Sequence, residues 1–296
     1  MNERVLLTVA SWEERFLLGI EKLLSSVKPS VLVMFYLDGV YAGWTQENRE
    51  KVEELCGRLR VRLASTMLSV EDSEKNWRAV ERDLIANVPK GAHVTVHIST
   101  MPRDIIWSCF WMLDHLGVRT DYVYHRPDRY GDWLSRDPQR PRLLYKMSGI
   151  CRIGAPTALL VQLGVDFERA YQLINFYEPS LLLLGVQSPS VHKSLAETAR
   201  KYAACFRRDL PSQDFEVDAF GTDHGESAIE TKVVPLLQSH NVIMSSLGPK
   251  PSAIALYRLN RKYPDISLAY APSKEFNRNY STGIGEVFAG RVWGDA

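Results

Sequence analysis

The chain alternates between short apolar runs and longer segments in which apolar residues recur every three or four positions. In the first half the apolar runs are residues 4–9, 31–37, 61–68, 92–98 and 118–125. The segments with helical spacing between them are residues 11–27, 45–59, 73–88 and 102–117. Continuous apolar runs of this length are typical of buried strands. Their alternation with helices predicts right-handed βαβ units and a parallel sheet.

The second half repeats this order. Its apolar runs are residues 157–163, 179–186, 215–220, 241–246 and 266–272, and its helical segments are 166–177, 190–206, 226–240 and 251–263. The second run of each half is entered through Pro-Ser, at Pro29 and at Pro179, and the fifth run of each half is followed or ended by a proline. The sequence therefore predicts an α/β protein of two tandem Rossmann-like halves, each a mainly parallel five-stranded sheet flanked by helices.

The two halves are separated by a segment rich in Arg, Pro and Gly. We expect a first Rossmann-like half at residues 1–128, a basic linker at 129–156 and a second half at 157–296. A solvated linker is the simplest interpretation of this basic segment.

Composition narrows the function without naming it. Hydrophobic residues make up 45%, charged residues 24%, and the formal net charge is +1. This balance is typical of a soluble globular protein, and it gives no indication of binding to nucleic acid or to an anionic membrane. No apolar run reaches the length of a membrane span, and the N-terminus does not resemble a signal peptide. We expect a cytoplasmic protein.

Cysteine and histidine spacing gives no sign of a metal or redox centre. The four cysteines form no Cys-x-x-Cys pair, and the seven histidines show no metal-ligand spacing. We therefore expect no metal and identify no cofactor, although a nucleotide remains a candidate ligand. The Walker pattern and the G-x-G-x-x-G fingerprint are both missing from the sequence. P-loop NTPases and ordinary dinucleotide dehydrogenases are therefore disfavoured.

The candidate site follows from the predicted strand order. If each sheet is ordered 3-2-1-4-5, its switch point lies between the first and fourth strands, where open α/β sheets bind ligands beyond the carboxyl ends. In both halves a proline-cation turn follows the fourth strand, Pro102-Arg103 and Pro249-Lys250. Hydroxyl groups, a nearby cation and the N-terminus of a helix together favour an anion, such as a phosphate.

A second polar loop, residues 271–286, follows the last strand and should lie on the same carboxyl edge. Together these loops supply the predicted ligand-binding residues. They are Ser11, Ser99, Thr100, Arg103, Ser245, Ser246, Gly248, Lys250, Ser252, Lys274, Tyr280 and Ser281. They predict binding or sensing of a nucleotide or another phosphorylated ligand.

Two other functions remain open. The chain could be an enzyme acting on a nucleotide or phosphorylated small molecule, with Glu13, Asp104 or Asp223 as the base. It could instead be a structural subunit with a degenerate site, joined to a protein partner or a second copy through aromatic surfaces. Candidates for such surfaces are Trp107, Trp111 and Trp133.

At ISTMPRDIIW and SSLGPKPSAIALY the chain resembles the CARF-type Rossmann-like sensors of prokaryotic defence systems. The resemblance covers these short turns and the βα rhythm. It departs from the family in having Pro-Arg and Pro-Lys where the family has Gly-Gly-Thr-Lys. The resemblance implies a cyclic-oligonucleotide or other nucleotide ligand, within a defence assembly. The ligand contacts that it implies are Ser11, Thr100, Arg103, Ser246 and Lys250.

Overall fold

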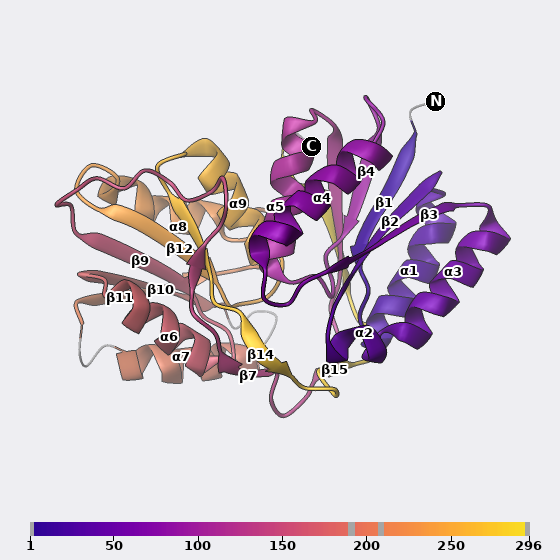
Figure 1. Cartoon of the computed structure of the whole chain (residues 1–296). Coiled ribbons are helices and arrows are strands. Elements are labelled where there is room, and N and C mark those ends of the chain that lie inside the picture. The colour runs from indigo at the N-terminus through magenta and orange to yellow at the C-terminus, as the bar shows by residue number, and fades with distance from the viewer. Residues whose placement is uncertain (1–2, 189–192, 207–209, 294–296) are drawn as a thin grey trace. The chain divides into compact units, whose positions relative to one another are not determined.

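The computed structural model describes residues 3–188, 193–206 and 210–293, and Figure 1 shows the arrangement of its helices and strands. The chain forms two compact units. The first unit is Met1–Asp132 together with Arg278–Ala296, and the second is Trp133–Asn277.

A six-stranded sheet forms the centre of the first unit. Its strands are β1 (Arg4–Val9), β2 (Val31–Leu37), β3 (Arg62–Leu68), β4 (His93–His97), β5 (Arg119–His125) and β16 (Val287–Arg291). They lie in the order β16-β5-β4-β1-β2-β3. The five strands from β1 to β5 are parallel, and β16 is antiparallel to β5. The predicted order 3-2-1-4-5 is therefore confirmed in this unit, with one added edge strand.

Helices cover both faces of this sheet (Figure 1). They are α1 (Glu14–Val27), α2 (Val40–Trp44), α3 (Gln46–Leu59), α4 (Ser73–Asn87) and α5 (Arg103–His115). Leu6, Leu32 and Met34 pack with the apolar stripe of α1 in one core cluster, which also takes Val52 from α3. Because side chains alternate across a strand, the neighbouring positions Val5, Val9 and Phe35 lie on the opposite face.

The second unit has the same sheet order. Its strands are β8 (Arg142–Leu143), β9 (Thr157–Gln162), β10 (Leu181–Gln187), β11 (Ser212–Val217), β12 (Asn241–Ser246) and β13 (Ser267–Tyr270). They lie in the order β11-β10-β9-β12-β13-β8, with β8 antiparallel at the edge. The β9–β13 strands thus repeat β1–β5 in order and direction. This confirms the predicted fold class of two Rossmann-like halves.

The helices of the second unit are α6 (Phe167–Tyr177), α7 (Lys193–Phe206), α8 (Glu226–Val233) and α9 (Ser252–Lys262), with a 3-10 turn at Val234–Leu236. Leu159, Val161 and Leu163 join the core cluster formed with α6 and α7. Figure 1 shows α8 and α9 on the other side of the sheet. Gln162, which alternates with these residues, therefore lies on the face covered by α8 and α9.

Short two-stranded ribbons extend both units. The strand β6 (Arg129–Tyr130) pairs with β15 (Ser281–Thr282), and β7 (Ser135–Pro138) pairs with β14 (Ser273–Phe276). The segment from Arg278 onward, which the sequence analysis assigned to the second half, is grouped with the first unit. The physical reason is that β15 and β16 complete the backbone hydrogen bonding of β6 and β5. The segment 129–156 contributes β6, β7 and β8 instead of forming a purely solvated linker.

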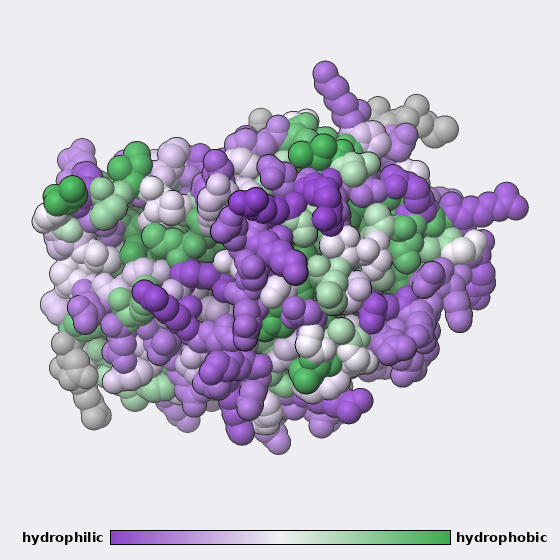
Figure 2. Space-filling view, in the orientation of Figure 1, coloured by the Kyte–Doolittle hydropathy of each residue, from purple (hydrophilic) through white to green (hydrophobic). Residues whose placement is uncertain are grey.

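Figure 2 shows hydrophilic residues over most of the viewed face, with hydrophobic residues in separate patches. Over the part of the chain that the structure describes, no helix combines the length and the apolar character needed to cross a membrane.

Two buried histidines face each other in the core of the first unit. His97 Nε2 and His125 Nδ1 lie 3.2 Å apart, and Thr8 Oγ1 lies 3.3 Å from His97 Nδ1. A side chain at Gly19 would collide with both rings, so the glycine lets α1 pack against the pair. Burial lowers the pKa of His97 well below its ordinary value, helped by His125 and Arg15. Burial also lowers the pKa of His125 to about 4, helped by Lys22 and Arg15.

This pair predicts acid sensitivity of the first unit. Both pKa values are depressed in the folded state, so the unfolded chain takes up protons first as the pH falls below about 6.5. The contribution of His125 is fully present above that pH and is lost as the pH falls to about 4, by up to about 1.4 kcal/mol per pH unit. His97 changes stability in the same direction. Scanning calorimetry between pH 7.5 and 5 should show this slope. The slope should be smaller in His125→Gln and unchanged in the control His115→Gln, whose ring is exposed. Equal slopes in all three proteins would contradict the prediction.

Candidate functional site

The carboxyl ends of β1 and β4 meet at the switch point of the first unit, as expected. Thr100, after β4, donates from Oγ1 to the Val9 carbonyl oxygen over 3.1 Å. Ser11, after β1, accepts from the Glu13 backbone N–H over 3.2 Å. Ser99 is fully buried and accepts from the His125 backbone N–H over 2.8 Å. The structure thus brings these three hydroxyl groups to one edge, where each makes a hydrogen bond within the protein.

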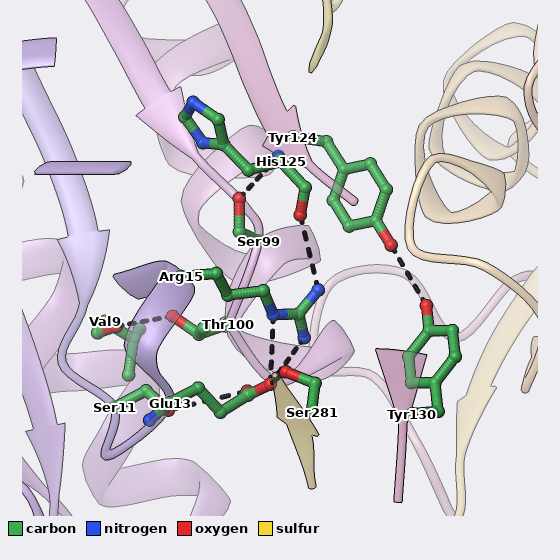
Figure 3. A network of polar contacts seen from close by, with 10 residues as sticks. All are labelled: Val9, Ser11, Glu13, Arg15, Ser99, Thr100, Tyr124, His125, Tyr130 and Ser281. Atoms are coloured by element: carbon green, nitrogen blue, oxygen red, sulfur yellow. Dashed lines mark hydrogen bonds and ion pairs between the residues drawn. The ribbon is translucent and has the colours of Figure 1, made fainter. Parts of the chain in front are cut away.

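A buried ion pair lies at the centre of this edge (Figure 3). The Arg15 guanidinium donates from Nε to Glu13 Oε2 over 2.9 Å and from Nη1 to the His125 carbonyl oxygen over 3.3 Å. Its Nη2 lies 2.8 Å from the same carboxylate, which also accepts the Ser281 hydroxyl. Burial alone would lower the pKa of Arg15, but Glu13 and the neighbouring tyrosines hold it above its ordinary value. The guanidinium, 1% exposed, therefore stays charged.

The second unit contains the same arrangement at corresponding positions. Arg169, in the first turn of α6, donates from Nε to the Ala271 carbonyl oxygen over 2.6 Å, just beyond β13. Its Nη1 lies 3.7 Å from Asp166 Oδ2, and that carboxylate also accepts the Ser135 hydroxyl. In both units a guanidinium therefore links the start of the first helix to the end of the fifth strand. Sequence reasoning missed both arginines. The only signal was the shared Glu-Arg pair, Glu14-Arg15 and Glu168-Arg169.

The backbone N–H groups at the start of α9 donate to carbonyl oxygens of the turn that precedes the helix. The N–H groups of Ser252, Ala253 and Ile254 donate to the carbonyl oxygens of Pro249, Lys250 and Pro251. The Ser252 hydroxyl donates to the Pro249 carbonyl oxygen and lies 2.6 Å from Ser246 Oγ. These three N–H groups of the helix N-terminus are thus already engaged, contrary to the expectation of a helix end with free donors.

The two loops at this switch point are in close contact. The Leu247 N–H donates to the Gln162 carbonyl oxygen over 2.9 Å. A Cβ at Gly164 would overlap the Leu247 carbonyl oxygen, and one at Gly248 would lie 3.2 Å from Gln162 Cγ. Glycine at both positions therefore permits the backbones to approach.

Some buried side-chain atoms at these edges have no hydrogen-bond partner in the described part of the chain, among them Arg169 Nη2, Ser273 Oγ and both amide atoms of Gln162. The Gln162 side chain is fully buried, and neither Oε1 nor Nε2 has a hydrogen-bond partner among the described residues. Each such buried polar group costs roughly 1–3 kcal/mol unless water or a ligand satisfies it. Its neighbour Gln187, at the end of β10, is also fully buried but accepts from the Ala219 N–H over 3.2 Å and donates to Asp218 Oδ1 over 3.2 Å.

The remaining predicted residues are dispersed. Ser245 donates from Oγ to the Ala269 carbonyl oxygen over 2.9 Å. Lys274 lies in β14 of the second unit, 3.3 Å from Asp137, whereas Tyr280 and Ser281 belong to the first unit. Arg103 is only 8% exposed, in the first turn of α5. Lys250 lies in the turn before α9 and is half-buried.

The proposed general bases are engaged in structural contacts. Glu13 is held by Arg15 and Ser281, and Asp104 Oδ1 accepts the Ile105 N–H over 3.0 Å. Asp223 accepts the N–H groups of Gly225 and Ser227 ahead of α8. Burial raises the pKa of Asp223, but its hydrogen bonds, led by that from Ser227, outweigh this and lower it overall. The enzyme alternative gains no support from these three carboxylates.

The aromatic surface expected of a structural subunit is also incomplete. Trp107 is fully buried in α5, so its ring belongs to the core of the first unit. Trp111 contacts Trp77 and stacks on His115, and Trp133 carries the Arg136 guanidinium 4.3 Å above its ring.

Comparison with known proteins gives a likeness in structure only. No protein-family model matches the sequence, and no curated protein matches it. The structure is similar to a type III CRISPR defence DNA nuclease activated by cyclic oligoadenylate, with a TM-score of 0.56 and 8% identity over 86% of this chain. The chain resembles the CARF-type sensors in its fold. It covers 63% of the nuclease, less than two thirds of that chain.

Two further similarities are weaker. Can2 from Sulfobacillus thermosulfidooxidans, in complex with cyclic tetra-adenylate, has a TM-score of 0.32 at 8% identity, over 40% of this chain and 32% of its own. A periplasmic ribose ABC transporter protein from Conexibacter woesei has a TM-score of 0.25 at 14% identity, over 88% and 69%. These scores are too low to support an argument.

The buried ion pair leads to a stability prediction. Glu13→Ala leaves the Arg15 guanidinium buried without its carboxylate, so it should lower the free energy of unfolding by roughly 3–5 kcal/mol. The neighbouring Glu14→Ala is the matched control, because Glu14 is exposed and accepts only the Gly283 N–H over 3.1 Å among its described hydrogen bonds. It should cost less than about 1 kcal/mol. Denaturant unfolding measures both, and a tolerated Glu13→Ala would show that Arg15 does not depend on this carboxylate.

Proposed function

We propose that this chain binds a nucleotide at the carboxyl edge of its parallel sheets and acts as a sensor of that ligand. The observation that carries the proposal is the confirmed 3-2-1-4-5 strand order, since such sheets bind ligands beyond the switch point. At that place the second unit has Ser246 and Gly248 beside the Gln162 amide, which has no partner among the described residues, and Lys250 follows in the same turn as Gly248.

The structural similarity supports the same ligand class. The nuclease with this fold is activated by cyclic oligoadenylate. We infer that this chain takes a ligand of related chemistry, in which phosphates would interact with the cation of Lys250 and the hydroxyl groups of the turn. Within this proposal the chain works in the cytoplasm as part of a prokaryotic defence assembly, with a partner protein or a second copy receiving the signal. The four cysteines are all free thiols, as a reducing compartment would leave them.

Direct binding tests the proposal. Isothermal titration calorimetry with cyclic tetra-adenylate, linear tetra-adenylate and ATP should give saturable binding for at least one of them. Lys250→Ala should weaken that binding about tenfold or more, because a charge-assisted hydrogen bond contributes roughly 1.5–3 kcal/mol. The control Lys51→Ala removes an exposed lysine on α3 that pairs with Glu47, and it should not change the affinity.

The outcomes separate the competing functions. Turnover of a bound nucleotide would favour an enzyme. If none of these nucleotides binds, and the purified chain instead carries a stable protein partner, the sensor proposal is wrong and a structural subunit is favoured.

A further inference from the structure

At the carboxyl ends of the strands, one face of each sheet carries different side chains in the two units. This face is covered by α4 and α5 in the first unit and by α8 and α9 in the second. In the first sheet Val9 pairs with Phe35, and both are buried. In the second sheet the corresponding pair is Gln162 and Gly185. A hydrocarbon side chain is thus replaced by an amide, and a large ring by a hydrogen.

The neighbouring positions show the same contrast. β2 ends at Leu37, paired with Leu68, whereas β10 ends at Gln187, paired with Val217. Beside Gln162 on β12 lies Ser246. The corresponding residue of the first unit is Ile98, which follows His97 at the end of β4 and is fully buried. The first unit therefore closes this face with apolar packing, while the second unit lines it with amide and hydroxyl groups.

In this layer, as far as the structure describes the chain, some polar side chains have hydrogen-bond partners, and Gln162 does not. Gln187 and Ser246 have partners within the second unit. Gln162 has none among the described residues for either amide atom. An isolated amide that only filled space would be better replaced by an apolar residue, as at Val9. Its presence beside the switch point is explained if another molecule supplies the missing donor and acceptor.

We propose that the second unit carries the working nucleotide site, and that Gln162 determines its specificity by reading the edge of a purine base. The proposal rests on the nucleotide-binding function proposed above. A glutamine amide offers an acceptor beside a donor, which matches the adjacent amino group and ring nitrogen of adenine. The first unit does not read a base in this way, because Val9, Phe35 and Ile98 leave it no polar group at the corresponding place.

Entry of the ligand requires a local movement. Both amide atoms of Gln162 are shielded from solvent, and the turn at Gly248 packs against the side chain. The turn from Leu247 to Pro251 therefore moves aside when the base enters. An ordered water molecule is the competing partner for the same two atoms, and the experiment below distinguishes it from a base.

Binding of two matched ligands to the Gln162→Met variant provides the test. Methionine keeps the length of the side chain and removes the amide. The first ligand is cyclic tetra-adenylate. The second is the same cyclic tetranucleotide with unsubstituted purine, which lacks the 6-amino group, in place of each adenine. The parent protein should bind cyclic tetra-adenylate about tenfold more tightly than the purine analogue, as expected for one bidentate base contact. Gln162→Met should bind both ligands equally weakly.

A stability comparison addresses folding separately. Gln162→Met should keep or raise the melting temperature, because it removes an unsatisfied amide. Gln187→Met makes the same change on the adjacent strand, but it removes the side-chain acceptor of the Ala219 N–H and one of the donors to Asp218 Oδ1. It should therefore lower the melting temperature by several degrees. If both variants lose stability alike, Gln162 is satisfied by a structural water and the proposal is overturned.

The remaining outcomes are also distinct. If the parent binds cyclic tetra-adenylate and Gln162→Met binds it equally well with the same preference for adenine, this inference fails while the sensor function stands. If the parent binds neither of the two ligands nor any other nucleotide, the proposed function itself fails, and this inference with it.

Discussion

A buried guanidinium at the start of the first helix holds the carboxyl edge of each unit together. Arg15 and Arg169 each contact a carboxylate near the start of their helix and a carbonyl oxygen at the end of the fifth strand or just beyond it. Because a buried charge is costly without partners, the strand end, the helix start and the serine-bearing ribbon must remain in place. The loops in which a ligand site is expected are therefore built on fixed supports.

The duplication explains why a buried arginine–carboxylate pair, Arg15–Glu13 and Arg169–Asp166, occurs in each unit. The differences around the two pairs indicate how the copies have diverged. The strand order and the packing of the first helix are the same in both units. The arginine–carboxylate pair recurs with looser geometry, 2.8 Å for Arg15–Glu13 and 3.7 Å for Arg169–Asp166. The layer beneath the later helices differs, because Phe35 and Val9 stand where Gly185 and Gln162 occur. Stability thus depends on the shared parts, while the parts that could recognise a ligand are free to differ.

The sequence was sufficient for the strands and helices because their apolar periodicity is strong. The runs 4–9, 31–37 and 241–246 match β1, β2 and β12 at both ends. The pairing of β16 with β5 could not be predicted, since VFAGR is short and carries no alternation that points to a partner. Nor could the state of Gln162, because a missing hydrogen-bond partner is a property of three-dimensional packing. The engagement of the α9 N-terminus could not be predicted either, because its prolines fold a turn whose carbonyl oxygens accept three of the N–H groups.

The return of the last segment to the first unit makes the second unit an insertion with neighbouring ends. Asn277 donates from Nδ2 to the Trp133 carbonyl oxygen over 2.8 Å, so the polypeptide enters and leaves the second unit at one place. Two covalent crossings, close together, join the units instead of a single tether. One of these crossings leads to β15, where Ser281 donates to the Glu13 carboxylate of the first unit. The second unit is therefore linked to the Arg15–Glu13 ion pair through the backbone itself.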